Sequence, residues 1–80
     1  MRHFYQMAQR NNQHLQSQLA QKLKTLRKQK GVSQQQTYHD TDVHIGRLET
    51  GKMNATINTI AILCDYFGLT LAEFFREGFE

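Results

Sequence analysis

Four histidines, one cysteine and several carboxylates are the residues of this chain that could bind a metal ion or transfer protons. The histidines are His3, His14, His39 and His44, and the cysteine is Cys64. A structural zinc site takes four ligands, and these scattered histidines and the single cysteine do not form the two closely spaced ligand pairs typical of such a site. Cys64 falls on the apolar stripe of an expected helix, where a small buried hydrophobe is the ordinary interpretation. We therefore expect no metal site and no other cofactor.

Asp40 and Asp42 lie close enough to His39 and His44 to suggest acid–base catalysis. An enzyme also needs a pocket, and covalent catalysis needs an activated nucleophile, but no motif of either kind accompanies these residues. The 80 residues form one small domain at most, which excludes an active site in a cleft between two domains. We therefore expect a protein that is not an enzyme.

The net charge of +3 is distributed unevenly along the chain. Residues 1–30 carry seven lysines and arginines and no acid, whereas residues 61–80 carry four acids and one arginine. A basic segment attracts a polyanion such as nucleic acid, because binding releases counterions. The alternative interpretation is a solvated helix surface with no such partner, and charge alone leaves both open.

Targeting signals are missing from the sequence. No apolar stretch approaches the roughly 20 residues that a membrane span needs, and the start has no apolar core of a secretory signal. A single cysteine cannot form an intrachain disulfide. We expect a cytoplasmic protein without a membrane partner.

The spacing of apolar residues predicts five short helices and no strand. The five expected helices cover residues 15–30, 33–39, 43–50, a stretch from position 56 or 58 to Gly68, and a stretch from Thr70 to about Gly78. Ser33 with Gln36 and Thr70 with Glu73 have the spacing of capping boxes. Asp42 is the expected N-cap of the third helix. Residues 1–12, which include two glutamines and two asparagines, are expected to form a disordered polar arm, and residues 13–80 the folded domain. The alternatives for this arm are an extension of the first helix and a segment that reaches DNA.

Three stretches of the sequence form an ordered series of motifs. They read Leu26-Arg27 followed by Gly31-Val32-Ser33-Gln34, then Arg47-Leu48-Glu49-Thr50-Gly51-Lys52, then Phe67-Gly68-Leu69-Thr70-Leu71. Together with two short helices joined by a tight turn, this series resembles the Xre family of lambda-repressor-like domains over residues 15–76. The resemblance implies a compact all-α, five-helix fold whose second and third helices form a helix-turn-helix. It also implies a sequence-specific transcriptional regulator, a dimeric repressor, that binds double-stranded DNA.

The resemblance assigns roles to individual residues. Gln34 matches a residue that binds phosphate at the start of the second helix, where a helix N-terminus favours an anion. Val43 and Arg47 are four apart in the third expected helix, so we expect them to share a face. Arg47 could bind guanine through two parallel hydrogen bonds, and Val43 could contact a thymine methyl group. The whole expected DNA-binding set is Gln34, Gln35, Val43, His44, Arg47, Lys52 and Asn54. Arg27 and Glu49 match an ion pair that joins the first helix to the third, so we assign both to structure.

Two features depart from the family pattern. The link from Gln34 to Glu49 is shorter than usual by most of a helical turn, and Thr37 stands where a core leucine is common. We expect Tyr38 to fill some of the lost volume. Gly46, in the middle of the third helix, allows either close approach to DNA or close packing of helices, and both interpretations stay open.

The C-terminal part carries apolar residues beyond those of the core stripes. Ile62 and Tyr66 are four apart, and together with Phe79 they could form an exposed patch that serves as a dimer face. The alternative is a set of scattered surface residues. The acidic, aromatic C-terminal end also suggests a second function, an antitoxin-like or other protein-interaction module in which DNA binding is secondary.

Overall fold

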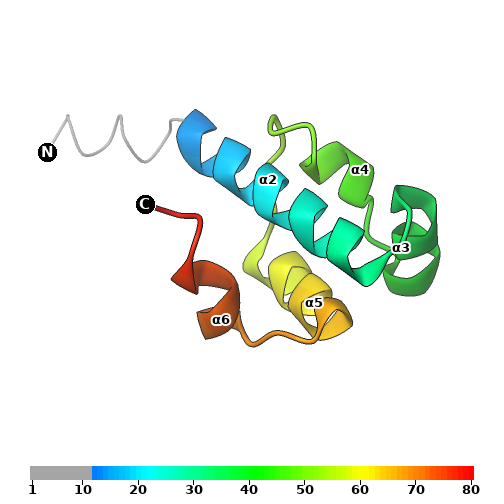
Figure 1. Ribbon diagram of the computed structural model, residues 1–80. Coiled ribbons are helices and arrows are strands. Elements are labelled where there is room, and N and C mark those ends of the chain that lie inside the picture. Colours follow the sequence, from blue (N-terminus) through cyan, green and yellow to red (C-terminus); the bar gives the residue numbers. More distant parts are fainter. Residues whose placement is uncertain (1–11) are drawn as a thin grey trace, which may run out of the picture.

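A computed structural model describes residues 12–80, and every regular element among these residues is an α-helix (Figure 1). The helices are α2 (Gln13–Lys30), α3 (Gln34–Thr41), α4 (Ile45–Leu48), α5 (Ile57–Phe67) and α6 (Leu71–Arg76). The expected all-α class with five helices is confirmed. The expected disordered arm lies outside the described residues, except for Asn12, whose side chain caps α2 by accepting from the Leu15 N–H.

Capping side chains set most of the helix starts. Thr56, rather than Asn58, caps α5 by accepting from the Thr59 N–H. Thr70 and Glu73 form the complete capping box that their spacing predicts. At α3 the prediction is half right, because Ser33 accepts from the Gln36 N–H but the Gln36 side chain bonds to Asp40 instead.

The third expected helix differs from its prediction. It is a single turn, α4, which begins two residues later and ends two residues earlier than expected, whereas α3 continues to Thr41, into the segment that was expected to link the two helices. Asp42 is therefore not the N-cap of α4. It ends α3 in the left-handed conformation, with a φ of 65°, and its N–H bonds to the Tyr38 carbonyl. Aspartate adopts this conformation more readily than most residues.

The core lies between α2, α4, α5 and α6 and is built from eight buried residues. They are Leu19, Leu23, Ile45, Leu48, Ile60, Leu63, Cys64 and Phe74. Burial raises the pKa of the Cys64 thiol, as expected for a cysteine used as a small hydrophobe. Thr37 is fully buried and its hydroxyl donates to the Ser33 carbonyl. Tyr38 is 40% exposed, so the prediction that it fills core volume is wrong.

None of the helices within residues 12–80 combines the length and the apolar character that crossing a membrane requires.

The left-handed turn at Asp42 leads to a stability prediction. Asp42→Val should lower the free energy of unfolding by about 1–3 kcal/mol, because a β-branched side chain is strained at positive φ. Asp42→Gly is the matched control and should stay within about 1 kcal/mol of the wild type. Urea denaturation of both variants measures the difference. Equal stability of the two variants would contradict the left-handed turn.

Candidate nucleic-acid interface

Helices α3 and α4 lie together at one side of the domain, with α4 packed against both α2 and α3 (Figure 1). The connection between them is short and contains only Asp42, Val43 and His44. Ile45 and Leu48 point into the core and fix α4 in place. The side chains that remain at the surface of this helix pair are the candidates for contact with a ligand.

One ion pair joins three segments beneath this surface. The Arg27 Nε lies 2.7 Å from Glu49 Oε2, and the Arg27 Nη2 donates to Glu49 Oε1 at 3.1 Å. Arg27 also donates to the Val32 carbonyl, and Gln34 Nε2 donates to Glu49 Oε1 at 3.0 Å. The side chains of Arg27 and Glu49 are only 12% and 3% exposed. The resemblance predicted this pair, and the structure contains it.

The ion pair shifts the pKa of both partners. The hydrogen bond to Glu49 raises the pKa of Arg27. Burial by itself would raise the pKa of Glu49, but the hydrogen bonds from Arg27 and Gln34 outweigh burial and lower it. Both groups are therefore held in their charged forms, and each depends on the other.

Gly46 lies directly under the side chain of Gln34. A Cβ at this position would be 2.9 Å from Gln34 Oε1, closer than such atoms normally approach. Of the two interpretations of Gly46, the structure favours close packing, here between α4 and the first residue of α3. The carboxamide of Gln34 is thus held between Glu49 and the α4 backbone.

Two shallow hollows border the outer surface of α4. One, of about 340 Å³, lies between α3 and α4 and is lined by Gln34, Gln35, Tyr38, His44, Ile45, Gly46 and Arg47. The other, of about 300 Å³, lies towards the loop that follows α4 and includes Val43, Met53 and Asn54 in its lining. His44 and Arg47 line both hollows, so they form the ridge between them. Within residues 12–80 the Arg47 guanidinium has no hydrogen-bond or ion-pair partner.

Val43 does not have the position that the sequence suggested. It precedes α4, and so it cannot share a helix face with Arg47. Its side chain is partly buried and packs against the core, although it also lines the second hollow. The expected pairing of Val43 and Arg47 on one helical face is therefore wrong.

The loop after α4 is tied back to α2 by two glutamines. Gln16 Nε2 donates to Asn54 Oδ1, and Gln13 Nε2 donates to the Gly51 carbonyl at 3.0 Å. The side-chain oxygen of Asn54, expected to face DNA, is thus used within the fold. Lys52 is exposed on the same loop.

The role of Gln16 was missed by the sequence analysis. The helical periodicity contains a signal for it, because Gln16 falls in step with Ala20, Leu23 and Arg27 on the inward face of α2. A second missed contact is the stacking of Tyr38 on His44, with ring centroids 4.3 Å apart and planes at 25°.

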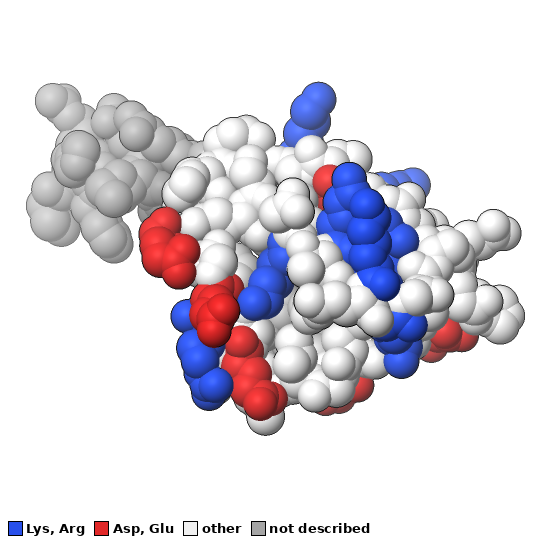
Figure 2. Space-filling view, viewed as in Figure 1, with Lys and Arg blue, Asp and Glu red and all other residues white. Residues whose placement is uncertain are grey.

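Charge is distributed on the surface as it is along the chain. Lys and Arg side chains form a strip over the C-terminal half of α2, and acidic side chains gather towards the C-terminal segment (Figure 2). Among residues 12–80, no three histidine, cysteine, aspartate or glutamate side chains come together as a metal site.

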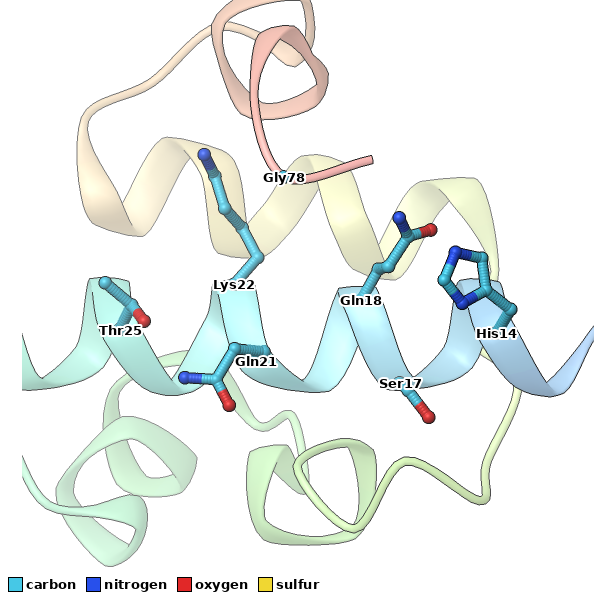
Figure 3. Close-up of a pocket in the computed structure, with 7 residues that line it drawn as sticks. All are labelled: His14, Ser17, Gln18, Gln21, Lys22, Thr25 and Gly78. Atoms are coloured by element: carbon cyan, nitrogen blue, oxygen red, sulfur yellow. The ribbon is translucent and has the colours of Figure 1, made fainter. Parts of the chain in front are cut away.

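A further hollow, of about 390 Å³, lies along α2 under the C-terminal segment (Figure 3). Two polar side chains of its wall bind that segment. Lys22 Nζ donates to the Glu77 carbonyl at 3.2 Å, and Gln18 Nε2 donates to the Glu80 carbonyl at 3.0 Å. These side chains stabilise the end of the fold.

The expected dimer patch does not form as one surface. Ile62 is 38% exposed, but the Tyr66 hydroxyl donates to Asp40 Oδ2 at 2.6 Å, and the Lys30 ammonium lies over the Tyr66 ring. Phe79 instead packs against the rings of Phe74 and Phe75 and lies partly buried against the core. The positive φ of Gly78 turns the chain back to this position.

An all-helical domain in which a tight turn joins α3 to α4 is a helix-turn-helix domain. A helix-turn-helix family model matches residues 23–74, from the middle of α2 into α6. The chain belongs to this Xre, or lambda-repressor-like, helix-turn-helix family, which binds DNA and is not an enzyme family. No curated protein and no solved structure matches the chain significantly.

The buried ion pair leads to a prediction about stability and pH. Glu49→Ala should lower the free energy of unfolding at pH 7 by about 3–5 kcal/mol, because it leaves Arg27 charged and unpaired. Since folding lowers the pKa of Glu49, the pair stabilises fully above the ordinary glutamate pKa of about 4.3. This contribution is lost as the pH falls through the lowered pKa of the folded state.

Urea denaturation between pH 7 and pH 2 measures both effects. The difference in the free energy of unfolding between wild type and Glu49→Ala should become smaller as the pH falls. Glu77→Gln is the control, because the Glu77 side chain is exposed at the far end of the fold. A difference that stays constant with pH would contradict the role assigned to the charged pair.

Proposed function

We propose that this domain recognises a specific double-stranded DNA sequence through the surface formed by α3 and α4. The single observation that carries the proposal is the ridge of His44 and Arg47 between two hollows, beside Gln34 at the start of α3. The Arg47 guanidinium, which has no partner within residues 12–80, can donate two parallel hydrogen bonds to guanine in the major groove. His44 can donate to a base or to a phosphate.

Phosphate contacts position the domain on the duplex. The N-terminus of α3 presents backbone N–H groups and the positive end of the helix dipole. Gln34 and Gln35 lie at this end, and Lys52 lies on the loop after α4. Such contacts supply affinity without sequence preference. The tie between Gln34 and Glu49 makes the position of the phosphate site depend on the buried ion pair.

Repression is the mode of regulation that we propose. Occupying a DNA site is enough to block another protein from it, and it needs nothing beyond the α3–α4 surface. Two copies would address two half-sites about 34 Å apart, or a multiple of that distance. We place the contact between copies on the face of α5 that Ile62 and Tyr66 share. Phe79 is no longer part of this proposed contact, because it packs against Phe74 and Phe75.

A protein-interaction function is the second candidate. Leu71 and Phe75 are 38% and 41% exposed and lie four apart on α6, so they share a face. The same C-terminal segment carries three glutamates, at positions 73, 77 and 80, so a partner with basic and apolar groups would suit it. Loss of partner binding on substitution of Phe75, with DNA binding retained, would support an antitoxin-like role.

Two substitutions separate base recognition from phosphate binding. Arg47→Ala should cost about 1–3 kcal/mol of binding free energy for the preferred sequence and relax the preference at the contacted base. Lys52→Ala should weaken binding to all sequences alike and reduce the salt slope by about 1. Fluorescence-anisotropy titrations against a selected site and a random duplex measure both. An equal loss for the two duplexes in Arg47→Ala would refute base recognition by Arg47.

The dimer contact has its own test on α5. Ile62→Asp should shift the protein from dimer to monomer in sedimentation equilibrium, because it places an unpaired charge in an apolar contact. Ile57→Asp is the matched control, since Ile57 is 65% exposed at the first position of the same helix. A wild type that is monomeric, or a dimer that survives Ile62→Asp, would contradict this placement.

A further inference from the structure

The helix that occupies the recognition position presents few side chains. Four residues of α-helix are about 6 Å long, against a major groove about 12 Å wide. Ile45 and Leu48 are buried in the core, and Gly46 has no side chain. Arg47 is thus the one residue within α4 that can reach a base, and His44 joins it from the N-cap position.

Tyr38 of α3 extends this small surface. Its ring is stacked on the ring of His44, and it lines the same hollow as Gln34 and Arg47. Tyr38 is 40% exposed, and the core position next to it is filled by Thr37. Neither the Tyr38 hydroxyl nor the His44 ring hydrogen-bonds to any of the residues 12–80. Packing of the core therefore does not account for an aromatic ring at this position.

Stacking has two consequences for recognition. It restricts the rotation of both side chains before a ligand arrives, so less conformational freedom is lost on binding. It also holds an aromatic ring in the hollow that Arg47 lines. In the major groove, apolar side chains recognise the 5-methyl group of thymine.

We propose that the stacked Tyr38–His44 pair is a second base-reading element, in which the exposed ring of Tyr38 contacts a thymine methyl group next to the base bound by Arg47. Recognition in this chain is thus shared between α3 and α4, rather than confined to the second helix of the motif. The inference rests on the proposed function, because it concerns the same DNA-binding surface.

The experiment begins with a DNA site selected by the wild-type protein from a random duplex pool. Each thymine of that site is then replaced by deoxyuridine, which removes only the methyl group. We expect replacement of one thymine in each half-site to lower the affinity roughly three- to fivefold, the effect of burying one methyl group. Tyr38→Ala should lose affinity for the selected site by a similar factor and should no longer distinguish thymine from deoxyuridine there.

Two further variants distinguish a role of Tyr38 in base recognition from a role in the stability of the fold. Tyr38→Phe keeps the ring and should retain the discrimination between thymine and deoxyuridine. Phe75→Ala removes a ring of nearly the same exposure, 41%, from α6 and should leave the discrimination intact. Thermal unfolding of each variant, together with its affinity for random duplex, reports any general damage to the domain.

Several outcomes would overturn the inference. In the first, the affinity of the wild type is unchanged by every deoxyuridine replacement. In the second, Tyr38→Ala still discriminates between thymine and deoxyuridine. In the third, Tyr38→Phe loses as much affinity and discrimination as Tyr38→Ala. Equal losses of Tyr38→Ala on selected and random duplex would also assign Tyr38 to structure. Failure of the proposed function is distinguishable, because the wild type would then select no site at all.

Discussion

The buried ion pair between Arg27 and Glu49 is the interaction on which the geometry of the α3–α4 surface depends. Arg27 comes from the last turn of α2, Glu49 ends α4, and Gln34 at the start of α3 binds the same carboxylate. Three helices that are separate in sequence are thereby held at one point. A buried pair of this kind adds little net stability over an apolar contact, but it is costly to break. Its main effect here is geometric, because it sets where the first turn of α3 lies relative to α4.

The short link between α3 and α4 determines the rest of the surface. The chain uses two residues of the expected link to lengthen α3 and reverses at Asp42 in a left-handed turn. Only one turn of helix then remains before Gly51. A one-turn α4 presents little surface of its own. The close contact of α3 and α4 at Gly46 and the stacking of Tyr38 on His44 add part of α3 to the same surface. The surface that we propose for DNA binding is therefore a junction of two helices.

Much of this fold could be predicted from local patterns. Leucine spacing, glycines at helix ends and capping residues act over a few positions, and they located α2, α5 and α6 closely. The bounds of α4 could not be found in this way, because a left-handed aspartate has no distinctive local signal. The position of Asn54 depends on Gln16, which is 38 residues away. Phe79 was misplaced because the turn at Gly78 and the rings of α6 together decide where it packs. The structure contains the ion pair between Arg27 and Glu49 that the resemblance implied. Val43 and Arg47 do not share a helix face, because the shortened link leaves Val43 before the start of α4.

The most direct test of the central claim is a salt titration of wild-type binding to random duplex DNA, run together with selection from a random pool. We expect affinity to fall steeply with salt, as it does when lysines, arginines and helix N-termini displace counterions from phosphates. We also expect an enriched site with two-fold symmetry, which a dimer with one reading surface per copy requires. Absence of binding at low salt would contradict the claim that the α3–α4 junction binds DNA. Salt-dependent binding without an enriched site would contradict the claim that it reads sequence.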